Sequence, residues 1–128
     1  MRKTAIAAAL WVAMSPVAGA AETGQSLYND NCAACHQRTG LGIKGAFPAL
    51  VGGKMVTGPL PALIPTVLNG RGGMPAFKSD LTDAQMALVL TYLRSSWGNK
   101  ASVITTAQVT QARIKASAAA KPKNLQAH

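Results

Sequence analysis

Two cysteines and one histidine lie together in the stretch Cys32-Ala33-Ala34-Cys35-His36, and their spacing constrains this chain more than any other feature. On an α-helix, residues three and four positions apart share one face. A helical turn over residues 32–36 would therefore direct both thiols and the imidazole toward a single object. The spacing predicts a helix here and a common binding target for three side chains.

The pattern Cys-x-x-Cys-His is also the attachment signature of a c-type haem. Cys32 and Cys35 would form thioether bonds to the edge of the porphyrin, while His36 would reach the iron. We therefore expect one covalently attached haem c. Aromatic residues make up 5% of the chain, so a large, flat, apolar cofactor would supply buried surface that the side chains lack.

Other kinds of site also use two cysteines. An exported protein with two cysteines often forms a disulfide, and a dithiol oxidoreductase shares this spacing but normally has a βαβ pattern. A zinc site would need a fourth ligand, and the second histidine of the chain is His128, at its end. An iron–sulfur cluster usually takes four cysteines. Haem is favoured because residues further along the chain also fit it.

The first twenty residues have the layout of a secretory signal peptide. Arg2 and Lys3 precede an apolar run over residues 5–17, and Ala18-Gly19-Ala20 is a small-x-small cleavage pattern. The run is shorter than the ~20 apolar residues that a transmembrane helix needs. We therefore expect residues 1–20 to be removed and the mature protein, from about Ala21, to lie in the periplasm.

Positive charge is unevenly distributed along the chain, whose formal net charge is +9. Residues 21–98 hold six basic and four acidic residues, whereas residues 99–128 hold five basic residues and no acidic one. Nucleic-acid binding would call for basic residues interleaved with aromatic ones, or for a known binding motif. Neither is present, so we expect no nucleic-acid partner.

Helical signals recur along residues 21–98, which we interpret as one domain. Thr23 would cap a helix that starts at Gly24 and continues into the 32–36 motif. Residues 61–68 favour a brief helix, and the stretch from Thr82 to Gln85 forms a capping box for a longer one. Its predicted core side is Met86, Val89, Leu90 and Leu93, with Trp97 on the same side before a stop at Gly98. No segment alternates with period two, so the fold class is all-α.

Residues 99–128 form a basic C-terminal extension. Thr105 and Gln108 could cap a further helix that reaches about Ala120. Its apolar face is narrow and mostly alanine, so packing on the domain and free movement both stay open. From Ala120 onward the composition is typical of disorder. The extension is either a solvated tail or a docking arm for an acidic partner or an anionic lipid surface.

Over roughly residues 23–98 the chain resembles a class I c-type cytochrome. The resemblance rests on the Cys32–His36 motif, on Phe47-Pro48-Ala49-Leu50 and on a glycine-rich loop that contains Met74-Pro75. It implies a small helical domain wrapped around one covalent haem, with His36 as one axial ligand of the iron and a later methionine as the other. Met74 matches the family position, whereas Met55 lacks the following proline. Met86 lies on the predicted core side of its helix.

Two further residues gain roles from this resemblance. In the family a proline carbonyl accepts a hydrogen bond from the ligating histidine, which fixes the ring and raises its basicity. Pro48 would take that role here, or would only stiffen its loop. Arg71 would either pair with a haem propionate or remain a solvated loop charge.

The resemblance implies an electron carrier and not an enzyme, because His36 and Met74 together would leave no vacant iron position. Expected partners are redox proteins, namely a periplasmic dehydrogenase and a terminal oxidase or other acceptor, with at most peripheral membrane contact. The segment from Tyr92 to Asn99 is similar to cytochrome domains of bacterial alcohol- and sugar-oxidising dehydrogenases. A haem enzyme or a gas-binding sensor is the alternative if the Met74 ligand is labile.

Overall fold

The computed structural model describes residues 19–120, and its regular elements are helices. These are α1 (Gly24–Asn31), α2 (Ala33–His36), α3 (Lys54–Thr57), α4 (Leu60–Asn69), α5 (Asp83–Ser95) and α6 (Thr106–Ala119). In the described range, β-type pairing is limited to the isolated bridges Ile43–Phe47 and Arg71–Met74. The all-α prediction is confirmed.

Some sequence predictions fall outside this range. The expected signal peptide does so except for its last two residues, and so do residues 121–128 of the expected disordered tail. Between residues 19 and 120, no helix has the length and apolar character that a membrane crossing requires.

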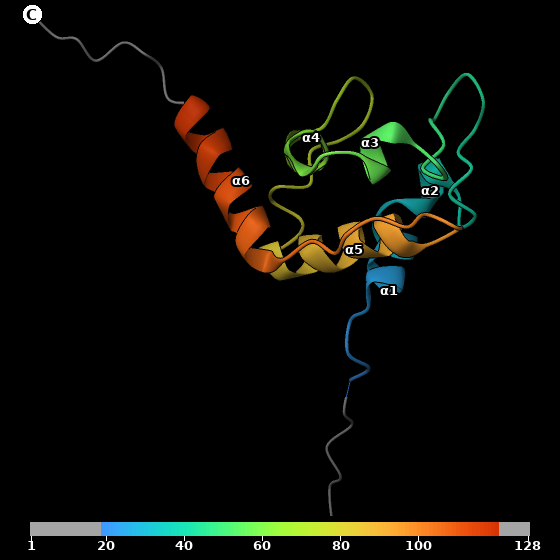
Figure 1. The fold of residues 1–128 in the computed structure, drawn as a ribbon, viewed down its shortest axis with the longest axis horizontal. Coiled ribbons are helices and arrows are strands. Elements are labelled where there is room, and N and C mark those ends of the chain that lie inside the picture. The colour runs from blue at the N-terminus through green and yellow to red at the C-terminus, as the bar shows by residue number, and fades with distance from the viewer. Residues whose placement is uncertain (1–18, 121–128) are drawn as a thin grey trace, which may run out of the picture.

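Helices α1 and α5 cross in close contact at the base of the molecule (Figure 1). Gly24 makes this possible, because a Cβ atom there would lie 2.7 Å from Cβ of Tyr92 and would also collide with the carbonyl oxygen of Leu88. Further along the contact, the rings of Tyr28 and Tyr92 have their centroids 5.5 Å apart. Helix α1, which precedes the cysteine motif, is thereby fixed against α5.

Helix α5 supplies much of that core. Its predicted apolar residues Met86, Val89, Leu90 and Leu93 are all at most 5% exposed. The predicted capping box is present, since Thr82 accepts from the backbone N–H of Gln85 and the Gln85 side chain accepts in return. These predictions are confirmed.

Two helix ends differ from the sequence prediction. The first helix does not run unbroken into the motif, because the backbone departs from helical geometry at Cys32 (φ −122°). There the side chain of Asn31 donates to the carbonyl of Leu27 at 2.9 Å, a local bond that competes with continued helix. Helix α5 ends at Ser95, so Trp97 lies beyond it with a left-handed φ of 54°.

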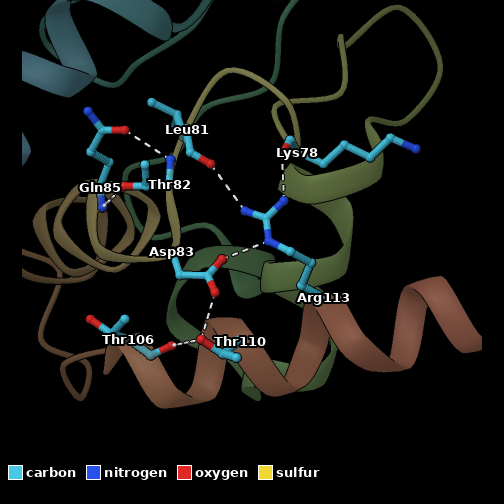
Figure 2. A network of polar contacts seen from close by, with 8 residues as sticks. All are labelled: Lys78, Leu81, Thr82, Asp83, Gln85, Thr106, Thr110 and Arg113. Atoms are coloured by element: carbon cyan, nitrogen blue, oxygen red, sulfur yellow. Dashed lines mark hydrogen bonds and ion pairs between the residues drawn. The ribbon is translucent and has the colours of Figure 1, made fainter.

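Helix α6 packs against α4 and α5 and rises beside α4 (Figure 1). Val109 is fully buried in the common core, and Ile104, just before the helix, is 5% exposed. Polar contacts around Asp83 reinforce this packing (Figure 2). Residues beyond 98 therefore contribute to the same core as α1 and α5.

Candidate haem-binding site

The cysteine motif forms one compact helical turn. The backbone N–H groups of Cys35 and His36 donate to the carbonyl of Cys32 at 3.2 and 2.9 Å, so the three side chains start from a single turn. Both cysteines are free thiols and are partly buried. They form no disulfide in the structure, which leaves both sulfur atoms available for bonding to another group.

The environment of Cys32 differs from that of a reactive dithiol. Burial, followed by the neighbouring Cys35, raises the pKa of the Cys32 thiol to about 11. Dithiol oxidoreductases need an attacking thiol whose pKa is lowered, so that thiolate is present near neutral pH. The direction of this pKa shift argues against that alternative.

The imidazole of His36 is oriented by the loop that follows α2. Its Nδ1 atom lies 2.9 Å from the carbonyl oxygen of Pro48. A carbonyl oxygen can only accept, so Nδ1 carries a proton and donates, and in the neutral ring Nε2 is then the nitrogen with the lone pair. The structure therefore brings together His36 and Pro48, two residues singled out from the sequence, and in the neutral ring this contact leaves Nε2 free for another partner.

Gly42 allows the loop to close on His36, and sequence reasoning did not identify it. Its N–H donates to the carbonyl of His36 at 3.0 Å. Its φ of +64° is left-handed, and a Cβ atom there would lie 2.6 Å from the carbonyl oxygen of Pro48. A glycine is required at position 42 because the backbone there passes close to the Pro48 carbonyl, which accepts the hydrogen bond from His36.

The aromatic rings of Tyr28, Tyr92 and Trp97 form a cluster on the other side of the motif. Tyr28 donates from its hydroxyl to the carbonyl of Gln37 at 2.6 Å, one residue after His36. The ring centroids of Tyr28 and Trp97 are 5.1 Å apart, and Trp97 also donates from Nε1 to the carbonyl of Arg38 at 3.1 Å. Trp97 thus packs against the core, as predicted, and holds the chain just after the motif.

Met74 lies in a tight turn after α4. The backbone groups of Arg71 and Met74 bond to each other in both directions, at 3.2 and 3.0 Å. Met74 is half-buried and packs against the core, and so does Met55. Met86 is completely buried, which confirms its predicted core position. Arg71 is exposed.

Exposed apolar side chains lie next to the motif. Leu41, Ile43 and Phe47 are 60%, 43% and 38% exposed, an unusual grouping of large apolar residues on one loop. Leu41, Phe47 and Pro48 border an open hollow of about 460 Å³. The loops that follow α2 and α4 rise on the same side of α5, with α3 between them (Figure 1). Two free thiols, an oriented imidazole and this uncovered apolar surface fit a flat apolar group such as haem.

A family model described as cytochrome c oxidase, cbb3-type, subunit III matches residues 19–93, more than half of the chain. This chain belongs to that cytochrome c family. The match covers the motif, the Pro48 loop, the Met74 turn and most of α5. The sequence resemblance to c-type cytochromes is thereby confirmed at the level of the family.

Individual proteins are similar to parts of this chain. The cytochrome c subunit of a quinone alcohol dehydrogenase from Gluconobacter oxydans (strain 621H) is 34% identical over 95 residues, which are 65% of this chain and 20% of the relative. Cytochrome c6 from Leptolyngbya boryana is 39% identical over 75 residues, covering 57% of this chain and 88% of the relative. Among solved structures, cytochrome c6 from the diatom Phaeodactylum tricornutum is 30% identical, with a TM-score of 0.48 and coverage of 58% and 90%.

These relatives differ in size. The chain spans about a fifth of the length of the dehydrogenase subunit but matches nearly the whole of cytochrome c6 from Leptolyngbya boryana. The two curated relatives are named as a cytochrome and as the cytochrome c subunit of a dehydrogenase.

Proposed function

We propose that this chain is an electron-transfer module that carries one covalently attached haem c. The observation that carries the proposal is the 2.9 Å contact between Nδ1 of His36 and the carbonyl oxygen of Pro48. In the neutral ring this contact leaves the Nε2 lone pair free, on the same helical turn as two free thiols. Cys-x-x-Cys-His attachment needs this donor set.

Each residue has a distinct task in this proposal. Cys32 and Cys35 would hold the haem through thioether bonds, and His36 would bind its iron. The carbonyl of Pro48 orients the imidazole and raises its basicity by accepting the Nδ1 proton in a hydrogen bond. Met74 would bind the iron as its second side-chain ligand.

With these two ligands, a bound haem would supply an iron that changes oxidation state with little rearrangement and at a raised potential. The task of the polypeptide would then be to bind and orient this cofactor, with no bond made in a substrate. Arg71, exposed three residues before Met74, would pair with a haem propionate.

The proposed place of action is the periplasm. Residues 1–20 would direct export and would then be removed. The electron donor is a dehydrogenase and the acceptor is a terminal oxidase, either as separate partners or with this chain as the cytochrome subunit. The names of the relatives support this proposal, since they include a quinone alcohol dehydrogenase subunit, and the matching family model describes an oxidase subunit. Membrane contact is at most peripheral.

Intact mass spectrometry of the protein exported from a host with haem-attachment machinery tests the attachment. We expect the mass of residues 21–128 plus one haem, retained after denaturation. Cys35→Ser removes one thioether and Cys32→Ser/Cys35→Ser abolishes covalent attachment, whereas Met74→Ala keeps it because both thioethers remain. A wild-type mass without haem and lower by two hydrogens would instead indicate a disulfide and overturn the proposal.

A further inference from the structure

Asn99 forms a buried polar link between α5 and the loop that follows the cysteine motif. Its side chain is 5% exposed. Oδ1 accepts from the N–H of Gly52 at 2.8 Å, while Nδ2 donates to the carbonyls of Leu50 and Leu93 at 3.1 and 2.8 Å. Both N–H groups and the oxygen of this amide are therefore satisfied, and an unpaired amide at such a depth would be costly.

The two loop residues that bond to Asn99, Leu50 and Gly52, lie two and four positions after Pro48. On the other side of Pro48, the backbones of Ile43 and Phe47 bond to each other at 2.9 and 2.8 Å. Leu50 donates to the carbonyl of Gly40 at 2.7 Å, which closes the loop on itself. Pro48 thus lies between two fixed points of the backbone.

Pro48 itself has no burial to hold it. Pro48 and Ala49 are both exposed, and a proline has no N–H with which to anchor its own backbone. The position of the Pro48 carbonyl relative to His36 is therefore set by its flanking bonds. On the C-terminal side, those bonds lead to Asn99 through Leu50 and Gly52.

We propose that Asn99 is a positioning residue for the haem ligand, acting through Leu50 and Gly52 to hold the Pro48 carbonyl against Nδ1 of His36. Trp97 assists at the start of the same loop, where its Nε1 bonds to Arg38 and its ring lies over Gly40, whose added Cβ would come within 2.6 Å of the ring. The segment that follows α5 thereby controls the hydrogen bond that makes His36 more basic. The inference rests on the proposed function for its effect on the iron.

Asn99→Asp tests this role because it keeps the shape of the side chain and removes both amide donors. The first readout is the solvent exchange rate of the His36 Nδ1 proton, followed by nitrogen-15 NMR on the full haem-loaded chain. We expect this rate to rise about tenfold, the factor that the loss of about one hydrogen bond produces. We also expect the reduction potential to rise, because a weaker bond to Pro48 makes His36 a poorer electron donor to the iron.

Thr91→Val is the matched control. The hydroxyl of Thr91 accepts from the N–H of Ile104 at 2.9 Å and so also joins α5 to the segment after it, but it touches no residue of the Pro48 loop. We expect this variant to lose stability while both readouts keep their wild-type values. If Asn99→Asp does not fold, Trp97→Phe loses the bond to Arg38 and serves instead, with a smaller change in the same direction.

Two results would overturn the inference. One is a wild-type Nδ1 exchange rate and reduction potential in Asn99→Asp. The other is a change in Thr91→Val as large as the change in Asn99→Asp. A wild-type chain without covalent haem would contradict the proposed function separately. A chain that carries haem but keeps the wild-type Nδ1 exchange rate in Asn99→Asp would contradict the positioning role alone.

Discussion

Arg113 on α6 donates a hydrogen bond from Nε to Oδ1 of Asp83, the first residue of α5, over 2.7 Å (Figure 2). The other carboxylate oxygen accepts from the hydroxyl of Thr110 at 2.6 Å. The remaining guanidinium nitrogens of Arg113 donate to the carbonyls of Lys78 and Leu81. One acidic residue and one basic residue thus attach α6 to the start of α5, so we predict that Asp83 controls how firmly α6 is docked.

Replacing Asp83 by asparagine should lower the free energy of unfolding by about 1–2 kcal/mol, because it weakens a charge-assisted hydrogen bond and removes a negative charge from a helix N-terminus. Urea denaturation followed by circular dichroism measures the change. Asp80→Asn is the control, since Asp80 is exposed and lies three residues earlier. Equal losses in the two variants would contradict a special role for Asp83.

The Asp83 carboxylate should also make the free energy of unfolding depend on pH. Hydrogen bonds from Thr110 and from Arg113 hold the pKa of Asp83 below its usual range. Because the pKa of Asp83 is lower in the folded state, the ionised carboxylate adds to the free energy of unfolding. This added stability is complete above the ordinary aspartate pKa of about 4 and is lost as the pH falls through the pKa of the folded state. The stability difference between wild type and Asp83→Asn should therefore shrink below about pH 4. A difference that stays constant from neutral pH to acid would contradict the assignment.

Gly70→Ala should damage the Met74 turn. Gly70 has φ +74° and ψ 174°, a conformation open essentially only to glycine, and its Cβ would lie 2.5 Å from the carbonyl oxygen of Met74. We expect a loss of about 1–3 kcal/mol, together with a reduced fraction of methionine-ligated iron in the absorption spectrum. Gly73→Ala is the matched variant in the same turn, because an added Cβ meets nothing within 4 Å. If both variants behave alike, the turn does not depend on Gly70.

Much of the helical fold could be predicted from local sequence signals. The boxes of Thr82 with Gln85 and of Thr105 with Gln108 both occur as expected, because a capping box involves residues only three positions apart. Docking of α6 could not be predicted from its narrow apolar face. It depends on the pair of Asp83 and Arg113, which lie thirty positions apart in the chain.

The candidate site shows the same division. The Cys32–His36 spacing predicted three side chains on one helical turn, which the structure has. Gly42 and Asn99 could not be found in this way, because their roles depend on how closely distant backbone segments approach in the folded chain. Gly42 passes over the carbonyl of Pro48, and Asn99 reaches Leu50 from beyond the end of α5.

The absorption spectrum of the ferric protein, compared between wild type and Met74→Ala, decides whether His36 and Met74 both bind the iron. We predict a low-spin spectrum with the weak band at the red end that marks methionine bound to iron, and we predict that this band is lost in the variant while the haem stays covalently attached. Met55→Leu should retain the band, since Met55 is the other half-buried methionine of the described chain. A high-spin ferric spectrum in the wild type, or a band that survives in Met74→Ala, would contradict a His36/Met74-ligated electron carrier.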